Sequence, residues 1–224
     1  MSQTSILNIK NQQEKLLAEI WKGMFYELTG SLDPFPELFN KIIKAYQEKH
    51  RKYHILSHLL YCFKELESVR SLLHSPLTVM FAIWYHDIVY DTCMQNNEEE
   101  SALAAKQALR EMGLFSENFI NKVVQMILAS KHTSHHGSND NDTLFFLDID
   151  LSILGADEET FDAYEKQIRL EYFWVELSAY KRGRTAVLES ILKNKPILKT
   201  EQFNTKCGKQ AEMNLKRSLA ALHS

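Results

Sequence analysis

Residues that interrupt helices are scarce in this chain, which has 7 glycines and 4 prolines among 224 residues. A fold of many short strands needs frequent turns, and glycine and proline are the residues that most often make them. Apolar residues instead recur at helical spacing, as in the first such series: Leu16, Leu17, Ile20, Trp21, Met24, Phe25 and Leu28. The sequence therefore predicts an all-α fold.

The predicted fold is a single domain of about ten helices. Residues 1–8 are expected to form a loose N-terminal tail and residues 9–224 the domain, because no repeat, low-complexity segment or change of composition marks a linker. One helix is expected to start near Tyr53, and another to run from Ser75-Pro76 through His86 and Asp87. Residues 131–143 are predicted to be a polar loop, and residues 144–151 a buried helix.

Composition narrows the classes of partner and compartment. The net charge of −3 argues against a dedicated nucleic-acid-binding protein. The three cysteines, Cys62, Cys93 and Cys207, form no CxxC motif and no disulfide framework, which favours a reducing compartment. The N-terminus lacks the apolar core of a signal peptide, and no apolar run is long enough to span a membrane. We expect a cytoplasmic protein with no membrane partner.

A histidine and an aspartate stand side by side in an apolar, aromatic segment, at positions 86 and 87. A charge in such surroundings is costly unless it is paired. A divalent cation would offset that cost, since imidazole and carboxylate are common metal ligands. An adjacent His-Asp pair also occurs at helix ends and on surfaces, so a metal site requires further ligands elsewhere in the chain.

Candidates for those ligands precede and follow the pair. His54 and His58 are four residues apart, which would place them one turn apart on one helical face. Asp148 lies in the apolar run 144–151, and its neighbours indicate an inward-facing side chain. Three helices could then supply four ligands to one ion: His58, His86, Asp87 and Asp148. The alternative for the two earlier histidines is a pair exposed at the surface.

The order His, then His-Asp, then Asp on successive helices resembles the HD superfamily of metal-dependent phosphohydrolases. The likeness extends to residues 51–58, 82–91, 97–102, 146–155, 168–172 and 180–184, which resemble an uncharacterised branch of predicted HD hydrolases. Together these motifs cover roughly residues 45–215. The resemblance implies an HD-type helical bundle, a divalent metal ion (Mg, Mn, Fe, Co, Ni or Zn), and hydrolysis of a small phosphomonoester or phosphodiester, with nucleotides among the candidates.

The first motif, Tyr53-His54 followed by His58, is similar to that of cyclic-nucleotide phosphodiesterases. That likeness implies that His54 is the general acid and His58 the metal ligand. Asp87 is predicted to be both a metal ligand and a catalytic residue. In other HD hydrolases an Arg-x-x-His motif supplies the ligand, which would make His54 the ligand and Arg51 a phosphate contact. This chain has Tyr90 where the phosphodiesterases have a further histidine, so the likeness does not imply their two-metal site.

Further side chains are candidates for supporting roles. The side chains predicted to bind a second ion or to orient water are Asp91, Glu98 and His132. Phosphate binding is predicted for Arg51, Lys131 and Arg169, with a structural ion pair as the alternative for Arg169. Tyr172, Phe173 and Trp174 are expected to pack in the core.

Two other functions stay open at this stage. The first is a diiron oxygenase of the HD type, in which His132 with His135 or His136 would supply the additional ligands. The second is a non-catalytic HD module that binds a ligand and signals.

Overall fold

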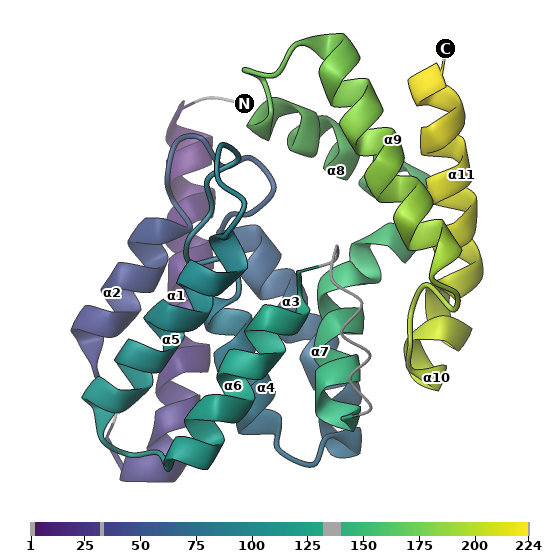
Figure 1. Ribbon diagram of the computed structural model, residues 1–224. Coiled ribbons are helices and arrows are strands. Elements are labelled where there is room, and N and C mark those ends of the chain that lie inside the picture. Colours follow the sequence, from purple (N-terminus) through teal and green to yellow (C-terminus); the bar gives the residue numbers. More distant parts are fainter. Residues whose placement is uncertain (1–2, 32–33, 132–139, 224) are drawn as a thin grey trace. The chain divides into compact units, whose positions relative to one another are not determined.

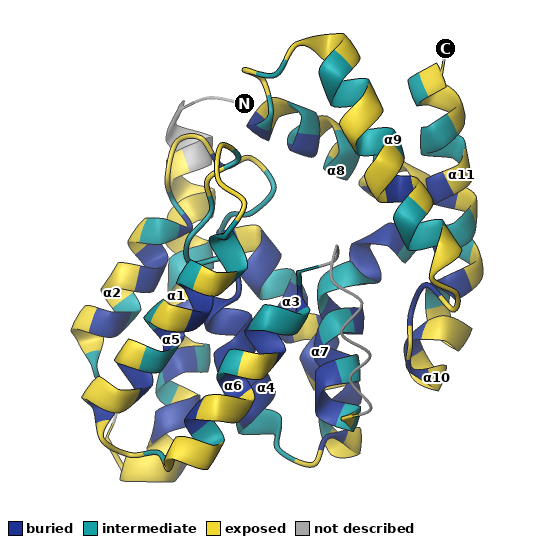
Figure 2. Ribbon diagram, viewed as in Figure 1, coloured by how far each residue is buried: buried dark blue, intermediate teal, exposed yellow. Residues whose placement is uncertain are grey.

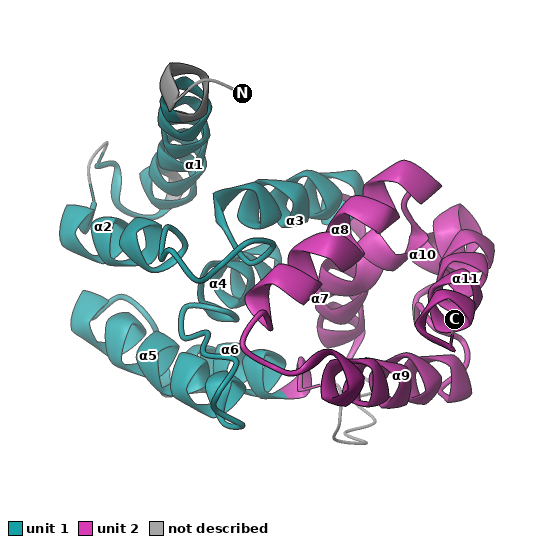
Figure 3. Cartoon of the chain, turned by 90° about the horizontal axis from the view of Figure 1, so that it is seen from above, with its two compact units in different colours: residues 1–70, 75–128 teal, residues 71–74, 129–224 magenta. Residues whose placement is uncertain are grey.

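The computed structural model describes residues 3–31, 34–131 and 140–223, and every regular element in these ranges is a helix (Figure 1). The predicted all-α single-domain fold is therefore confirmed. Within this fold the chain forms two compact units, residues 1–70 with 75–128 and residues 71–74 with 129–224 (Figure 3). None of the described helices is both long and apolar enough to span a membrane.

The first unit is built around one central helix, α4. Its helices are α1 (Gln3–Thr29), α2 (Pro36–Ala45), α3 (Leu56–Val69), α4 (Pro76–Tyr85), α5 (Asn97–Met112) and α6 (Glu117–Ala129). Every residue of α4 from Thr78 to Tyr85 is buried, and Figure 3 shows the other helices of the unit around it. An α-helix that is apolar on all sides is stable in water only when neighbours cover it completely.

Aromatic side chains join these helices at Trp84, near the end of α4. Its ring centroid lies 5.4 Å from that of Trp21 on α1, 6.2 Å from Phe39 on α2 and 4.7 Å from Phe63 on α3. Such rings bury large apolar areas and contribute most to core stability. The last turn of α4, which leads directly into His86, is thus packed against three other helices of the unit.

The second unit contains α7 (Asn141–Leu151), a 3-10 turn (Ser152–Gly155), α8 (Glu158–Glu171), α9 (Leu177–Lys193), α10 (Glu201–Phe203), a π-helical turn (Asn204–Gly208) and α11 (Lys209–His223). The buried Asn214 on α11 donates two hydrogen bonds, to the carbonyls of Leu154 (2.9 Å) and Ala156 (2.8 Å). A Cβ atom on Gly155 would lie 2.6 Å from the Cβ of Cys207, so this close approach requires glycine.

Several element boundaries differ from the sequence predictions. Helix α1 begins at Gln3, whereas residues 1–8 were expected to be loose; residues 3–8 contain neither proline nor glycine to stop the helix. Helix α7 begins at Asn141, three residues before the predicted start, because the Asp140 carboxylate caps it by accepting the Thr143 N–H at 2.9 Å. Figure 2 contrasts the buried α4 with the exposed faces of α9 and α11.

Candidate metal centre

The two early histidines do not share a helix. Helix α3 begins at Leu56, and its N-cap residue Ile55 has an extended backbone (φ −122°), so His54 precedes the helix and His58 lies in its first turn. The prediction that both lie one turn apart on one helical face is therefore wrong, because Ile55 breaks the helical path between them. Their rings are nevertheless near each other, with centroids 5.7 Å apart.

The His-Asp pair follows α4, whereas we expected that helix to carry both residues. His86 is the C-cap of α4 and keeps helical backbone angles, while Asp87 lies in the turn that follows. Arg51, whose side chain is fully buried, donates to the carbonyls of Asp87 (2.5 Å) and Ile88 (3.0 Å). A helix end leaves carbonyls without partners inside the helix, so Arg51 fixes the turn that presents Asp87.

Three ligand-type atoms converge in the first unit. His58 Nε2 lies 3.0 Å from His86 Nε2, His86 Nε2 lies 3.0 Å from Asp87 Oδ2, and His58 Nε2 lies 3.7 Å from the same oxygen. The point equidistant from these atoms is roughly 1.9 Å from each, which is compatible with metal bonds of about 2.0–2.2 Å. The arrangement can therefore hold one divalent ion through three protein ligands.

Hydrogen bonds set which nitrogen of His86 is available. His86 Nδ1 lies 2.9 Å from the carbonyl oxygen of Ile83. Because a carbonyl oxygen can only accept a hydrogen bond, Nδ1 carries the proton. In the neutral ring, Nε2 is therefore unprotonated, and its lone pair is directed at His58. A backbone carbonyl that fixes the tautomer in this way is typical of a metal-bound histidine.

Without a metal ion, the lone pair on His86 Nε2 can accept a hydrogen bond instead. His58 Nε2–H can donate to His86 Nε2 at 3.0 Å. His58 Nδ1 would then be unprotonated, and the buried Cys62 thiol lies 3.8 Å from this nitrogen. An ion would replace the proton between the two histidines, so metal binding and protonation at this position compete.

His54 approaches the carboxylate from another direction. Its Nε2 lies 3.8 Å from Asp87 Oδ2, and its side chain is 17% exposed, against 0% for His58. The His54 ring packs on Tyr90, with centroids 4.1 Å apart. The buried histidine is thus placed as a ligand, whereas His54 lies at the solvent-facing side, where a proton donor can exchange its proton. This geometry favours His58 over His54 as the first ligand.

Sequence reasoning missed one residue that supports the site, Tyr46, and predicted a different role for another, Arg51. Tyr46 on the turn after α2 is fully buried, and its hydroxyl accepts the Asp87 N–H at 3.3 Å. Burial raises the pKa of the Tyr46 phenol well above its usual value, and the nearby Asp87 carboxylate raises it further. Arg51 was predicted as a phosphate contact, but it donates to backbone and to Glu48 Oε2 at 3.0 Å. Only long-range contacts reveal both roles.

Asp148 belongs to the second unit, and its place as a fourth ligand stays a prediction. Its carboxylate is buried and accepts three hydrogen bonds there, from the backbone N–H of Lys199 (2.6 Å) and from the backbone N–H (2.6 Å) and hydroxyl (2.7 Å) of Thr200. Thr200 is the N-cap of α10. Burial raises the pKa of Asp148, although these hydrogen bonds act to lower it.

The remaining candidates are not among the three residues whose ligand-type atoms converge. Asp91 is exposed, and its carboxylate accepts the Cys93 N–H at 2.8 Å in a local turn, while the half-buried Glu98 lies in the first turn of α5. Lys131 follows α6 and belongs to the second unit, as does Arg169 on α8. His132, like His135 and His136, lies outside the described residues.

Comparisons with known proteins give no relative from which to transfer a role. No protein-family model matches the chain. No curated protein and no solved structure matches it either.

Proposed function

We propose that this protein is a metal-dependent phosphohydrolase that cleaves a small phosphomonoester or phosphodiester. The observation that carries the proposal is the convergence of His58 Nε2, His86 Nε2 and Asp87 Oδ2, with the tautomer of His86 fixed by the Ile83 carbonyl. The resemblance to HD hydrolases adds the reaction class. Asp148 is the proposed fourth ligand, and its buried carboxylate supplies the negative charge that a divalent cation favours.

A bound divalent ion would act as a Lewis acid on the phosphate and lower the pKa of a water molecule toward neutrality. The protein's own groups supply the rest. His58 and His86 hold the ion through neutral nitrogens, so they are effective only when deprotonated. Asp87, 19% exposed, lies between these ligands and His54, and so connects the buried side of the site to the solvent-facing side.

His54 is the proposed general acid. Its Nε2 lies 3.8 Å from Asp87 Oδ2, at the solvent-facing side of the site. The stacking of its ring on Tyr90 restricts its orientation. A proton delivered to the leaving oxygen by a histidine is typically worth about 10²–10⁴-fold in rate.

The test combines metal analysis with a phosphate-release screen. The full chain is loaded with Mg²⁺, Mn²⁺, Fe²⁺, Co²⁺, Ni²⁺ or Zn²⁺ and assayed on nucleotides, sugar phosphates and phosphodiesters. We expect His86→Ala to lose both metal binding and turnover, and His54→Gln to keep the metal while turnover falls by about 10²–10⁴-fold. Asp157→Ala, an exposed cap of α8, is the control that should change neither.

The other outcomes separate the rival functions. A variant lacking His86 that keeps full activity would refute the proposal. Two irons per chain with an oxygen-dependent absorption change would indicate the oxygenase. A bound metal with no turnover on any phosphate ester would indicate a ligand-binding module.

A further inference from the structure

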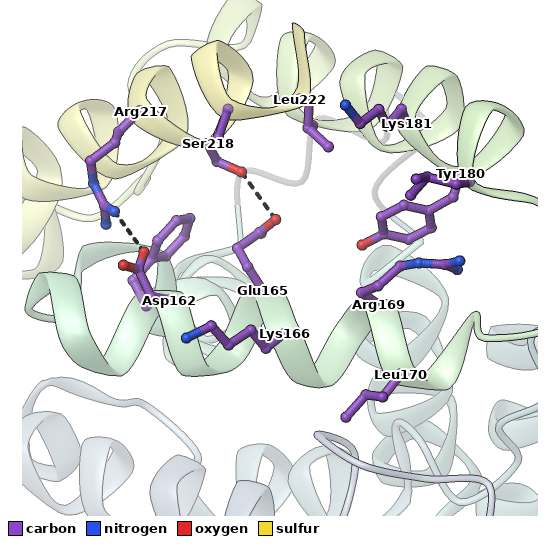
Figure 4. Close-up of a pocket in the computed structure, with 13 residues that line it drawn as sticks. Asp162, Glu165, Lys166, Arg169, Leu170, Tyr180, Lys181, Arg217, Ser218 and Leu222 are labelled. Carbon is purple, nitrogen blue, oxygen red and sulfur yellow. Dashed lines mark hydrogen bonds and ion pairs between the residues drawn. The ribbon is translucent and has the colours of Figure 1, made fainter. Parts of the chain in front are cut away.

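A cavity of about 630 Å³ opens in the second unit between α8, α9 and α11 (Figure 4). Its volume lies within the range of small-molecule binding sites, about 300–1,000 Å³. The lining is mostly apolar and includes Phe161 and Leu170 from α8, Leu177 from α9 and Leu222 from α11. Such a lining suits the hydrocarbon part of a ligand.

The acidic side chains of the cavity are already neutralised. Asp162 Oδ1 accepts from Arg217 Nη1 at 2.6 Å. Glu165 forms an ion pair with Arg184 and accepts the Ser218 hydroxyl at 3.0 Å. Figure 4 shows Asp162 and Glu165 projecting from α8 toward Arg217 and Ser218 on α11, and Arg184 lies on α9. Neither carboxylate is therefore left to attract a cation.

Three basic side chains of the lining have no such compensation. Lys166 and Lys181 form no ion pair among the described residues. Arg169 donates to the carbonyls of Tyr172 (2.5 Å) and Val175 (3.1 Å), and these neutral acceptors leave its positive charge uncompensated. Its guanidinium lies 4.6 Å from the centroid of the Tyr180 ring. The cavity thus combines apolar walls with an excess of positive charge.

An exposed apolar segment adjoins the cavity. Phe173 and Trp174, in the turn between α8 and α9, are 70% and 51% exposed, which corrects the prediction that they pack in the core. The turn is held by hydrogen bonds that the Arg169 guanidinium donates to the carbonyls of Tyr172 and Val175, so these rings do not need to enter the core to fix it. Leu170 and Leu177, which line the cavity, are exposed on either side of them. Contiguous exposed apolar side chains commonly mark a binding surface.

We propose that this cavity binds a single-chain amphiphilic anion, of the class of medium-chain carboxylates and alkyl phosphates. The lining residues of α8 run from Phe161 to Leu170, about 14 Å of helix at 1.5 Å per residue. The alkyl chain lies along this length, and the positive charge of the basic lining residues attracts the anionic head group. The proposal rests only on the second unit and does not depend on phosphohydrolase activity.

Isothermal titration of the full chain tests the proposal, with a chelator present so that binding at the metal centre is not counted. The probes are decanoate, decyl phosphate, decanol and inorganic phosphate, each below the concentration at which it self-associates. We expect both amphiphilic anions to bind. Decanol should bind at least about tenfold more weakly, a loss of about 1.4 kcal/mol, and inorganic phosphate should not displace decanoate.

Paired variants locate the site. The double variant Lys166→Gln with Lys181→Gln should weaken decanoate binding about tenfold. Leu177→Asn, at a half-exposed apolar position of the lining, should weaken the binding of decanoate and decanol alike. Lys193→Gln with Lys209→Gln removes two exposed charges outside this cavity and should leave binding unchanged. Equal binding of decanol and decanoate, full displacement by inorganic phosphate, or no heat from either anion at concentrations on the order of 1 mM would each overturn the proposal.

Discussion

Asp87 in the first unit and Asp148 in the second were predicted as ligands of the same ion, but their surroundings differ. Asp87 Oδ2 faces imidazole nitrogens, with His86 at 3.0 Å, His58 at 3.7 Å and His54 at 3.8 Å. Asp148 accepts hydrogen bonds at 2.6–2.7 Å from Lys199 and Thr200 at the start of α10. The first carboxylate lies among groups that bind metals and exchange protons, whereas the second stabilises a helix terminus.

Because the surroundings differ, removing the Asp148 carboxylate and removing the Asp87 carboxylate should lower the free energy of unfolding by different amounts. Two of the hydrogen bonds that Asp148 accepts, from the N–H and the hydroxyl of Thr200, are buried at the start of α10, so these donors would lose their acceptor where water does not readily replace it. The imidazoles around Asp87 can re-form hydrogen bonds with one another, as His58 and His86 already do. Asp148 is thus expected to act mainly on stability, and Asp87 mainly on metal binding.

Alanine substitution of the two aspartates should give the largest effect and should separate their two roles. Asp148→Ala should lower the free energy of unfolding by about 3 kcal/mol, because two backbone N–H groups and one hydroxyl lose their acceptor. Asp87→Ala, at a partly exposed side chain, should change it by no more than about 1 kcal/mol in chelator but weaken metal binding at least about 100-fold, more than the loss of a supporting group. Urea unfolding and competition with a chromophoric chelator measure both quantities.

Asp157→Ala is the matched control. Asp157 also caps a helix, accepting the Thr160 N–H at 2.9 Å, but it is exposed. Its loss should cost about 1 kcal/mol and leave metal affinity unchanged. If Asp87→Ala destabilised the protein as much as Asp148→Ala does, the distinction between the two carboxylates would be wrong.

A smaller effect is expected at Arg51, which positions Asp87. Arg51→Lys keeps the charge, but a single ammonium cannot reach Glu48 and the carbonyls of Asp87 and Ile88 together. We expect metal affinity to fall about tenfold, as for other groups that orient a ligand. Arg70→Lys is the control, because Arg70 is half-buried and forms its ion pair with the nearby Glu67.

The outcome at Arg51 also decides between its two roles. A contact with the substrate phosphate would lower kcat/KM for a phosphate ester while leaving the affinity for metal alone unchanged. A positioning role lowers the affinity for metal in the absence of any substrate.

The sequence predicted the helical class and the participants in the site better than their roles. Scarce glycine and proline, with helical spacing of apolar residues, sufficed for the fold class, and the apolar flanks of His86 indicated its burial. The local break at Ile55 escaped prediction because one extended residue leaves the hydrophobic spacing intact. The partners of Asp148 lie 51 and 52 residues away, and those of Arg51 lie 36 and 37 residues away. Such contacts depend on tertiary packing, which no local pattern specifies.

The smallest expected effect is the pH dependence that Asp148 adds to stability. Burial raises its pKa in the folded protein above the unfolded value of about 3.9. The folded state therefore binds the extra proton, so this contribution is complete below the unfolded pKa and is lost as pH rises through the folded pKa. In chelator, the free energy of unfolding of the wild type should fall with rising pH relative to that of Asp148→Asn, which does not titrate.

Urea unfolding of both proteins between about pH 3.5 and 6 measures that difference, a window that begins just below the unfolded pKa of Asp. A difference that rises with pH would mean that the hydrogen bonds from Thr200 and Lys199 outweigh burial and that the carboxylate is stabilised in its charged form. In the expected case, ionised Asp148 lowers the stability of the folded protein, because burial disfavours the charged form. A bound cation favours the ionised carboxylate, so added metal should reverse this pH dependence if Asp148 is a ligand and leave it unchanged if Asp148 only caps α10.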